Sequence, residues 1–140
     1  MTSPTIVLDS EAVQALSSPA HPKHRRVLAM MNIVAQRKRR SVATTMIVPT
    51  SVRVEAGWDR TMPGWATANR LRISDVHLDR RLADSAAAIR RRVGDHISVV
   101  DAHIGAVLQS IESGQTTVLT SDPDRIAAVA EGSAKHIVRI

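Results

Sequence analysis

Short apolar runs rich in β-branched residues alternate with longer amphipathic segments along this chain of 140 residues. Such runs are typical of parallel strands, which are buried on both faces and so lack a strict alternation of apolar and polar residues. An acid ends the first run at Asp9, and a proline ends the second at Pro49. The predicted strands cover residues 4–8, 42–48, 71–76, 116–120 and 136–140.

Between these runs, apolar residues recur at the spacing of three and four that is typical of an amphipathic helix. Val27, Met30, Met31 and Val34 follow this spacing in the second such segment. Helices are predicted over residues 11–16, 23–36, 79–93 and 123–130, with one that begins at residues 49–51 and one that runs from Asp101 to about residue 114. Residues 96–100 form a short apolar segment that leads into the helix that begins at Asp101.

Strands that alternate with helices from one end of a chain to the other predict a parallel sheet with helices on both faces. We therefore expect an α/β protein, a three-layer α/β/α sandwich with a central parallel sheet of four to five strands. The chain has no internal repeat and no linker long enough to divide it. Residues 1–140 are accordingly expected to form one domain.

The composition excludes several classes of function. The chain has no Cys, so disulfides, thiol catalysis and zinc held by thiolates are ruled out. It has two Trp and no Phe or Tyr, which leaves almost nothing for base stacking on aromatic side chains. No apolar run approaches the length of a membrane span, and we expect a cytoplasmic protein that does not enter membranes.

Basic residues outnumber acidic ones by 19 to 13, which gives a formal net charge of +6. A positive surface favours a polyanionic partner such as RNA or DNA, but an Arg-rich composition can equally follow from a GC-rich genome. The basic clusters also have two interpretations. They would either contact an RNA backbone or form solvated helix ends. These clusters lie at residues 37–40, 80–81 and 90–92.

Acidic residues recur where predicted strands end or predicted helices begin. Asp9 ends the first strand, Glu55 lies in the helix after the second, and Asp101 lies at a helix start. Asp122 and Asp124 follow the strand at residues 116–120. Because ligands of open α/β sheets bind outside the carboxyl ends of the strands, we expect these carboxylates to meet at one edge of the sheet.

Carboxylates that are crowded together raise one another's pKa and destabilise the fold unless a cation compensates them. Mg²⁺ or Mn²⁺ prefers oxygen ligands and would suit such a cluster, where it promotes attack of water at phosphorus. The helix start at Asp101 and the turn at residues 120–122 add N–H and hydroxyl donors for a phosphate or a metal-bound water. Each acid taken singly has a simpler interpretation as a helix N-cap or a turn residue.

Four segments carry a resemblance to a known family: TIVLDSEAV, VPTSVRVEAGW, SVVDAHIGAVL and TVLTSDPDRI. In this order and spacing they resemble the PIN domain, a metal-dependent ribonuclease fold. In size the chain is similar to the VapC-type toxins of bacterial toxin–antitoxin pairs. The resemblance covers nearly the whole chain, from Thr5 to Ile126.

The resemblance implies a Mg²⁺- or Mn²⁺-dependent endoribonuclease, an RNA substrate, a cognate antitoxin protein and a homodimer. The acids that would hold the metal or act in catalysis are then Asp9, Glu55, Asp101, Asp122 and Asp124, with Thr120 and Ser121 as polar supports. Glu55 would bind the metal or position the attacking water.

Other interpretations remain open at the level of sequence. A PIN-like module that has lost its chemistry would bind RNA or a protein through its basic surface. A flavodoxin-like receiver domain also places acids at strand ends, although this chain lacks the expected acid pair after the first strand. His103 is expected to be a partly exposed helix residue, and Trp58 and Trp65 pack either inside the monomer or against a partner.

Overall fold

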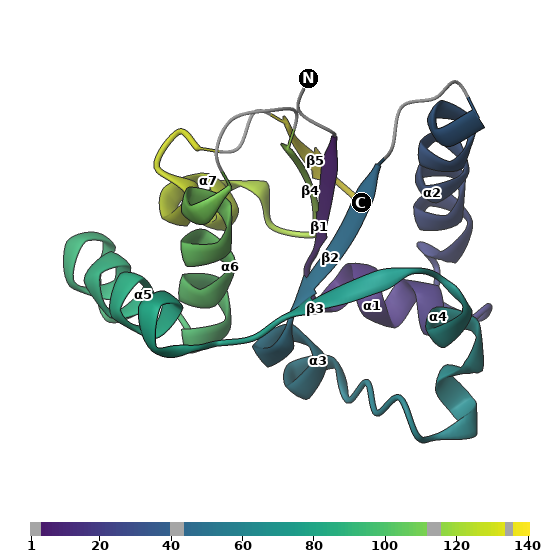
Figure 1. Cartoon of the computed structure of the whole chain (residues 1–140), viewed down its shortest axis with the longest axis horizontal. Helices are drawn as coiled ribbons and strands as arrows, with labels where there is room; N and C mark the ends of the chain where they lie inside the picture. Colours follow the sequence, from purple (N-terminus) through teal and green to yellow (C-terminus); the bar gives the residue numbers. More distant parts are fainter. Residues whose placement is uncertain (1–3, 40–43, 112–115, 134–135) are drawn as a thin grey trace.

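The computed structural model describes residues 4–39, 44–111, 116–133 and 136–140 (Figure 1). Within these ranges, five strands form one parallel sheet in the order β3-β2-β1-β4-β5. The strands are β1 (Thr5–Leu8), β2 (Thr45–Pro49), β3 (Ile73–Val76), β4 (Thr116–Thr120) and β5 (His136–Arg139). The predicted α/β class and the parallel sheet are therefore confirmed.

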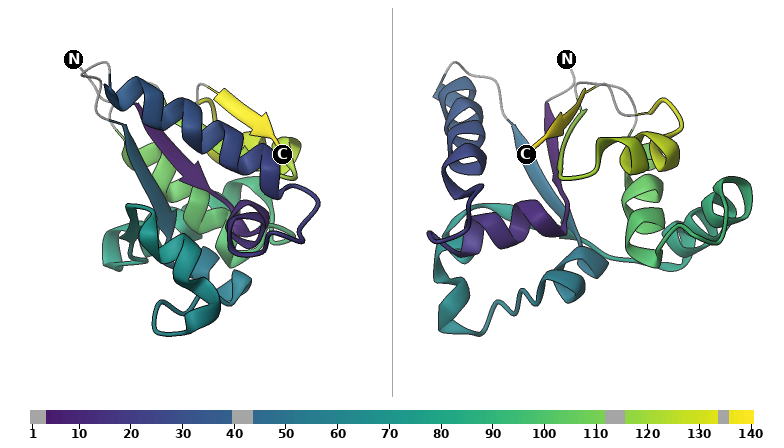
Figure 2. Two further views of the ribbon diagram at one scale, coloured as in Figure 1. Left: turned by 90° about the vertical axis from the view of Figure 1, so that its right-hand side faces the viewer. Right: turned by 180° about the vertical axis from the view of Figure 1, so that it is seen from behind.

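Helices cover both faces of the sheet and make the molecule a three-layer sandwich (Figures 1 and 2). One side carries α1 (Ser10–Ser17), α2 (His24–Arg39) and α4 (Ala66–Arg70), and the other carries α5 (Arg80–Val93), α6 (Val99–Ser110) and α7 (Pro123–Ala130). The helix α3 (Thr50–Ala56) follows the end of β2 directly, and a short 3-10 helix, η1 (Pro63–Trp65), precedes α4. In the part of the chain that the structure describes, no helix is long and apolar enough to span a membrane.

The core is aliphatic and is centred on β1, β4 and α6. Val7, Leu8, Val118 and Leu119 are fully buried in the two central strands. In α6, all residues from 102 to 108 are buried, because the sheet lies on one side of this helix and α5 and α7 pack on the other. A helix that is apolar on every side needs such neighbours, and this position fixes where its first turn, with Asp101, must lie.

The strand order distinguishes this fold from that of a flavodoxin-like receiver domain. Strand β1 lies between β2 and β4, whereas flavodoxin-like sheets have the order 2-1-3-4-5. The order also places the connections after β1 and β4 on opposite faces, since β1 continues into α1 and β4 into α7. The carboxyl ends of these two neighbouring strands therefore form the switch point of the sheet.

Several predicted boundaries differ from the structure. Helix α6 begins at Val99, ahead of the predicted start at Asp101, because Ser98 is the N-cap and its hydroxyl accepts the Asp101 N–H at 3.0 Å. Helix α2 extends to Arg39, and β2 includes Pro49, which lies beside Val76 of β3. The predicted strand positions 42 and 43, like Arg40, lie outside the described residues.

The segment between α3 and β3 contains η1 and α4, which were not predicted. Gly57 and the Pro63-Gly64 pair favour a broken loop, and they do end α3 and open η1. The two short helices form because tertiary contacts hold them: Asn69 of α4 accepts the indole N–H of Trp58 at 2.9 Å and donates to the Arg60 carbonyl at 2.8 Å.

Gly105 marks the closest approach of α6 to α7. A Cβ atom there would lie 2.6 Å from the Val129 carbonyl oxygen and 2.8 Å from its Cβ. We therefore expect Gly105→Ala to destabilise the protein by about 1–3 kcal/mol, although alanine favours helix formation by about 1 kcal/mol. Urea unfolding measures the change.

The matched control is Gly64→Ala, because a Cβ at Gly64 meets nothing within 4 Å. Its effect should stay within about 0.5 kcal/mol. Equal stability of the two variants would contradict the close packing of α6 on α7.

Candidate functional site

A cavity of about 220 Å³ opens at the carboxyl ends of β1 and β4. This is the switch point of the sheet, where open α/β folds bind their ligands. Asp9, Glu55, Asp101 and Asp122 all line it, so the structure brings together four of the five predicted acids. The other lining residues are Ser10, Glu11, Gln14, Val100, Ile104, Thr120, Ser121, Arg125 and Ile126.

Asp9 joins three parts of the chain at the floor of the cavity. It is the N-cap of α1, and its Oδ1 accepts the Ala12 N–H at 2.9 Å. Its Oδ2 accepts the Ser121 N–H at 3.2 Å from the turn after β4. Burial raises the pKa of Asp9 above its usual value, against the effect of its hydrogen bonds to Thr120, Ala12 and Ser121. The carboxylate is thus rigidly placed but poorly solvated.

Asp101 lies in the first turn of α6 and carries the least satisfied oxygen of the site. Its Oδ2 is buried and has no hydrogen-bond partner among the described residues. Burial raises the pKa of Asp101 most strongly, and the negative charges of Glu55 and Asp122 raise it further, while Ser98 and Arg125 act in the opposite direction. A cation bound beside Asp101 would relieve both effects.

Glu55 reaches the cavity from the exposed last turn of α3. Its Oε1 accepts a short hydrogen bond from the hydroxyl of Ser10, the first residue of α1. Because Glu55 is exposed, it lies at the open side of the cavity, whereas Asp9 is buried. Ser10 was not predicted as a site residue, because a serine beside an N-cap has no distinguishing pattern.

The two acids after β4 are in different positions. Asp122 lines the cavity, caps α7 by accepting the Arg125 N–H at 3.2 Å, and lies 3.2 Å from the Arg125 guanidinium. Asp124 is exposed and is not among the residues that line the cavity. Asp122 precedes α7 as its N-cap, whereas Asp124 lies within the first turn of the helix, after Pro123.

Of the two residues expected to support the last acid, Thr120 contacts Asp122, whereas Ser121 contacts Asp9 instead. The Thr120 hydroxyl accepts the Asp122 N–H at 3.0 Å and shapes the turn, while the Ser121 N–H binds Asp9. Arg125 and Glu11 are cavity residues that sequence reasoning missed. Arg125 follows Asp122 by three residues, so the helical spacing from a predicted site acid could have indicated it. Glu11 follows Asp9 by only two residues, a spacing that does not place two helical side chains on one face.

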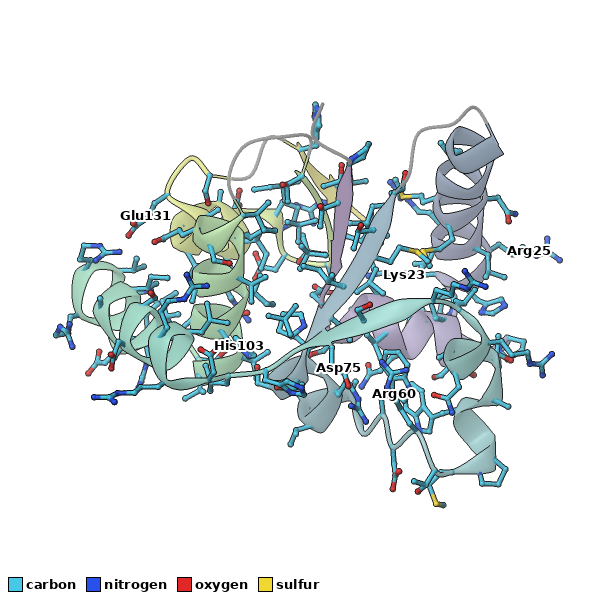
Figure 3. The ribbon with its side chains drawn as sticks, in the orientation of Figure 1. Lys23, Arg25, Arg60, Asp75, His103 and Glu131 are labelled. Atoms are coloured by element: carbon cyan, nitrogen blue, oxygen red, sulfur yellow. The ribbon has the colours of Figure 1, made fainter. Side chains whose placement is uncertain are left out.

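The expectation for His103 was wrong, because this side chain is fully buried. It extends from α6 toward α3, where its Nδ1 lies 2.7 Å from the Ser51 hydroxyl (Figure 3). Burial lowers the pKa of His103 below its usual value. Because residues 102–108 of α6 are all buried, His103 has no access to solvent although Asp101, two positions before it, is partly exposed.

Trp58 packs inside the monomer. It is 3% exposed, stacks on Trp65 at 5.9 Å between ring centroids, and lies under the Arg60 guanidinium at 4.3 Å. Arg53 and Arg60 both bind Asp75, at 2.8 and 2.9 Å, and together they lower its pKa although burial opposes this (Figure 3). This network fixes the chain between α3 and β3, away from the acidic cavity.

The arginines of α5 differ in their contacts. Arg90 donates to the carbonyls of Ile97 and Asp95, and Arg92 pairs with Glu131 at 3.0 Å, so both have structural partners. Arg80, Arg81 and Arg91 are exposed. Of the predicted cluster at residues 37–40, the first three lie in α2 and Arg40 lies outside the described residues.

We expect His103→Asn to change how stability depends on pH. A lowered folded-state pKa means that the unfolded chain binds the proton more readily, so wild-type stability is complete above pH 6.5 and declines as the pH falls below that value. The asparagine variant, although less stable by about 1–3 kcal/mol at neutral pH, should lack this component.

Urea unfolding at a series of pH values between about 8 and about 5 measures the effect. Ser51→Ala is the control, because it removes the hydrogen bond but leaves the titrating ring in place and should keep the wild-type pH dependence. Parallel curves for wild type and His103→Asn would contradict the assignment.

Among the described residues, no group of three or more His, Asp or Glu side chains lies close enough, in its present rotamers, to hold a metal ion. The cavity acids therefore surround a shared space without converging on one point. No protein-family model and no curated protein matches the sequence of this chain.

Proposed function

We propose that the protein is a metal-dependent endoribonuclease that hydrolyses phosphodiester bonds of RNA in the acidic cavity. The observation that supports this most directly is the gathering of Asp9, Glu55, Asp101 and Asp122, from four separate segments, at the switch point of a parallel sheet. Acids that served only as helix caps or turn residues would not be expected to line one cavity.

The residues of the cavity suit a hard divalent cation. The side chains that could bind it offer only oxygen ligands, which Mg²⁺ and Mn²⁺ prefer. The buried Oδ2 of Asp101 has no hydrogen-bond partner in the described structure, so it is available as a ligand. Asp9, Asp101 and Asp122 would hold the ion, with Glu55 as a further ligand at the open side. Asp124, outside the cavity, is left out of the proposed set.

When bound, the ion would supply Lewis-acid chemistry by promoting the attack of water at phosphorus and neutralising the charge that develops there. Glu55 is placed to orient the attacking water, since its carboxylate lies at the solvent side and is held by Ser10. The water oxygen would bond to phosphorus, the bond from phosphorus to O3′ would break, and O3′ would take a proton. The products would carry a 5′-phosphate and a 3′-hydroxyl.

The charge distribution favours a polyanionic substrate. The acids face the cavity, whereas the exposed Arg80, Arg81 and Arg91 lie on α5, beside α6. The chain has a formal charge of +6 in spite of the acidic cavity. Such a surface attracts the phosphate backbone and leaves the carboxylates of the cavity to bind metal.

The PIN resemblance further supports a toxin of a toxin–antitoxin pair that acts in the cytoplasm as a homodimer and binds a cognate antitoxin protein. Val54 and Met62 are large apolar residues with exposed fractions of 82% and 55%. A partner protein that covered them would bury both side chains; Val54 lies in α3, the helix that also carries Glu55, and Met62 lies in the segment after it.

We expect the purified protein to cleave RNA in Mg²⁺ or Mn²⁺, and Asp9→Asn to lower the rate by at least about 100-fold, because it removes a charged ligand. Gel analysis of an end-labelled RNA measures the rate and identifies the product ends. Asp124→Asn is the matched control, since it makes the same chemical change outside the cavity and should cleave at close to the wild-type rate.

Cleavage that persists in excess chelator, or that is equal in Asp9→Asn and wild type, would contradict the proposal. RNA binding without cleavage would favour the alternative of an inactive RNA-binding module.

A melting experiment tests the metal site without any substrate. A ligand that binds only the folded state stabilises it by about 2.7 kcal/mol at a concentration of 100 times its Kd. We therefore expect Mn²⁺ to raise the melting temperature of the wild type by several degrees and to have little effect on Asp101→Asn. Equal shifts in the two proteins would place any bound metal elsewhere.

A further inference from the structure

Arg125 holds two of the proposed metal ligands together. Its Nη1 lies 3.5 Å from Asp101 Oδ2, and its Nη2 lies 3.2 Å from Asp122 Oδ2. Asp101 belongs to α6 and Asp122 to the turn before α7, so the guanidinium bridges two segments that come together at the cavity. It occupies the space beside the buried oxygen where a cation would bind.

The contacts of Arg125 are weak compared with other arginine pairs in the protein. Its guanidinium makes no hydrogen bond to either carboxylate in the described structure, whereas Arg53 and Arg60 donate to Asp75 at 2.8 and 2.9 Å. The Arg125 side chain is also 54% exposed. An ion pair of this exposure contributes little to stability, so the side chain can leave its position readily.

The charge of the cavity is far from neutral with Arg125 alone. Among the lining acids, Glu11 pairs with Lys23 at 3.5 Å, which leaves Asp9, Glu55, Asp101 and Asp122 against Arg125 as the one base that lines the cavity. A divalent cation carries twice the charge of a guanidinium. It also approaches carboxylate oxygens to about 2.0–2.2 Å, which is much closer than the arginine nitrogens lie. The cation would therefore bind Asp101 and Asp122 more strongly than the Arg125 guanidinium does.

We propose that Arg125 is a resident counter-ion of the cavity, which pairs with Asp101 and Asp122 in the metal-free protein and is displaced from them by the divalent cation. It therefore sets the metal concentration that the site requires. This inference rests on the proposed metal site, and it assigns to that site a form of internal regulation by competition.

Calorimetric titration of the metal-free protein with Mn²⁺ tests the proposal. Arg125→Gln removes the competitor, and we expect it to bind Mn²⁺ roughly 3- to 10-fold more tightly than the wild type does. Arg125→Lys keeps the charge but cannot contact both carboxylates as the guanidinium does. Its affinity for Mn²⁺ should therefore fall between those of Arg125→Gln and the wild type. Arg91→Gln is the matched control, since it removes the same charge from an exposed position outside the cavity.

The outcomes distinguish the counter-ion role of Arg125 from the metal site on which it rests. Tighter binding by Arg125→Gln than by Arg91→Gln supports the counter-ion role. Equal affinities of these two variants, or weaker binding by Arg125→Gln, overturn that role while leaving the metal site intact. If Asp101→Asn binds Mn²⁺ as tightly as the wild type, the metal site itself fails. A thermal melt of each variant confirms that it is folded.

Discussion

The carboxylate of Asp9 is the interaction on which the site depends. One oxygen accepts the Ala12 N–H at the start of α1, and the other accepts the Ser121 N–H in the turn after β4. These bonds connect the end of β1 to the first turn of α1 and to the turn between β4 and α7, and these two helices lie on opposite faces of the sheet. They also require a largely buried anion, because both N–H groups point at the same side chain. The burial that gives this connection its rigidity raises the pKa of Asp9 and makes the cavity a place where further negative charge is costly.

The rest of the cavity is arranged under that electrostatic constraint. Asp101 has a buried oxygen without a hydrogen-bond partner, and its neighbours Glu55 and Asp122 are acidic as well. A fold can keep such a cluster only if positive charge is available nearby or arrives with a ligand. Arg125 supplies part of it within the chain, at distances that are long for an ion pair. The proposed divalent cation and the proposed Arg125 exchange are two consequences of this one imbalance.

Much of the fold follows from local sequence signals. The β-branched runs predict all five strands of the described sheet, because buried parallel strands need apolar residues on both faces. The acids Asp9 and Asp122 could be placed from sequence, since each follows a strand and caps a helix. The helices η1 and α4 could not be predicted, because they depend on the contacts of Asn69 with Trp58 and Arg60 and have no helical pattern of their own. The burial of His103 was missed for a related reason, since it follows from the helices and sheet that bury residues 102–108 of α6.

The sequence by itself determined which segments become strands and helices, and that acids stand at their ends, since both depend on neighbours along the chain. Only the tertiary structure decided the strand order, and with it which acids share a cavity. The choice between Asp122 and Asp124 shows this clearly: both follow β4 and look alike in sequence, yet Asp122, the N-cap of α7, lines the cavity and Asp124, within the first turn of the helix, lies outside it. The position of Arg125 beside Asp101 was decided in the same way, because it requires α6 and α7 to pack against each other at Gly105.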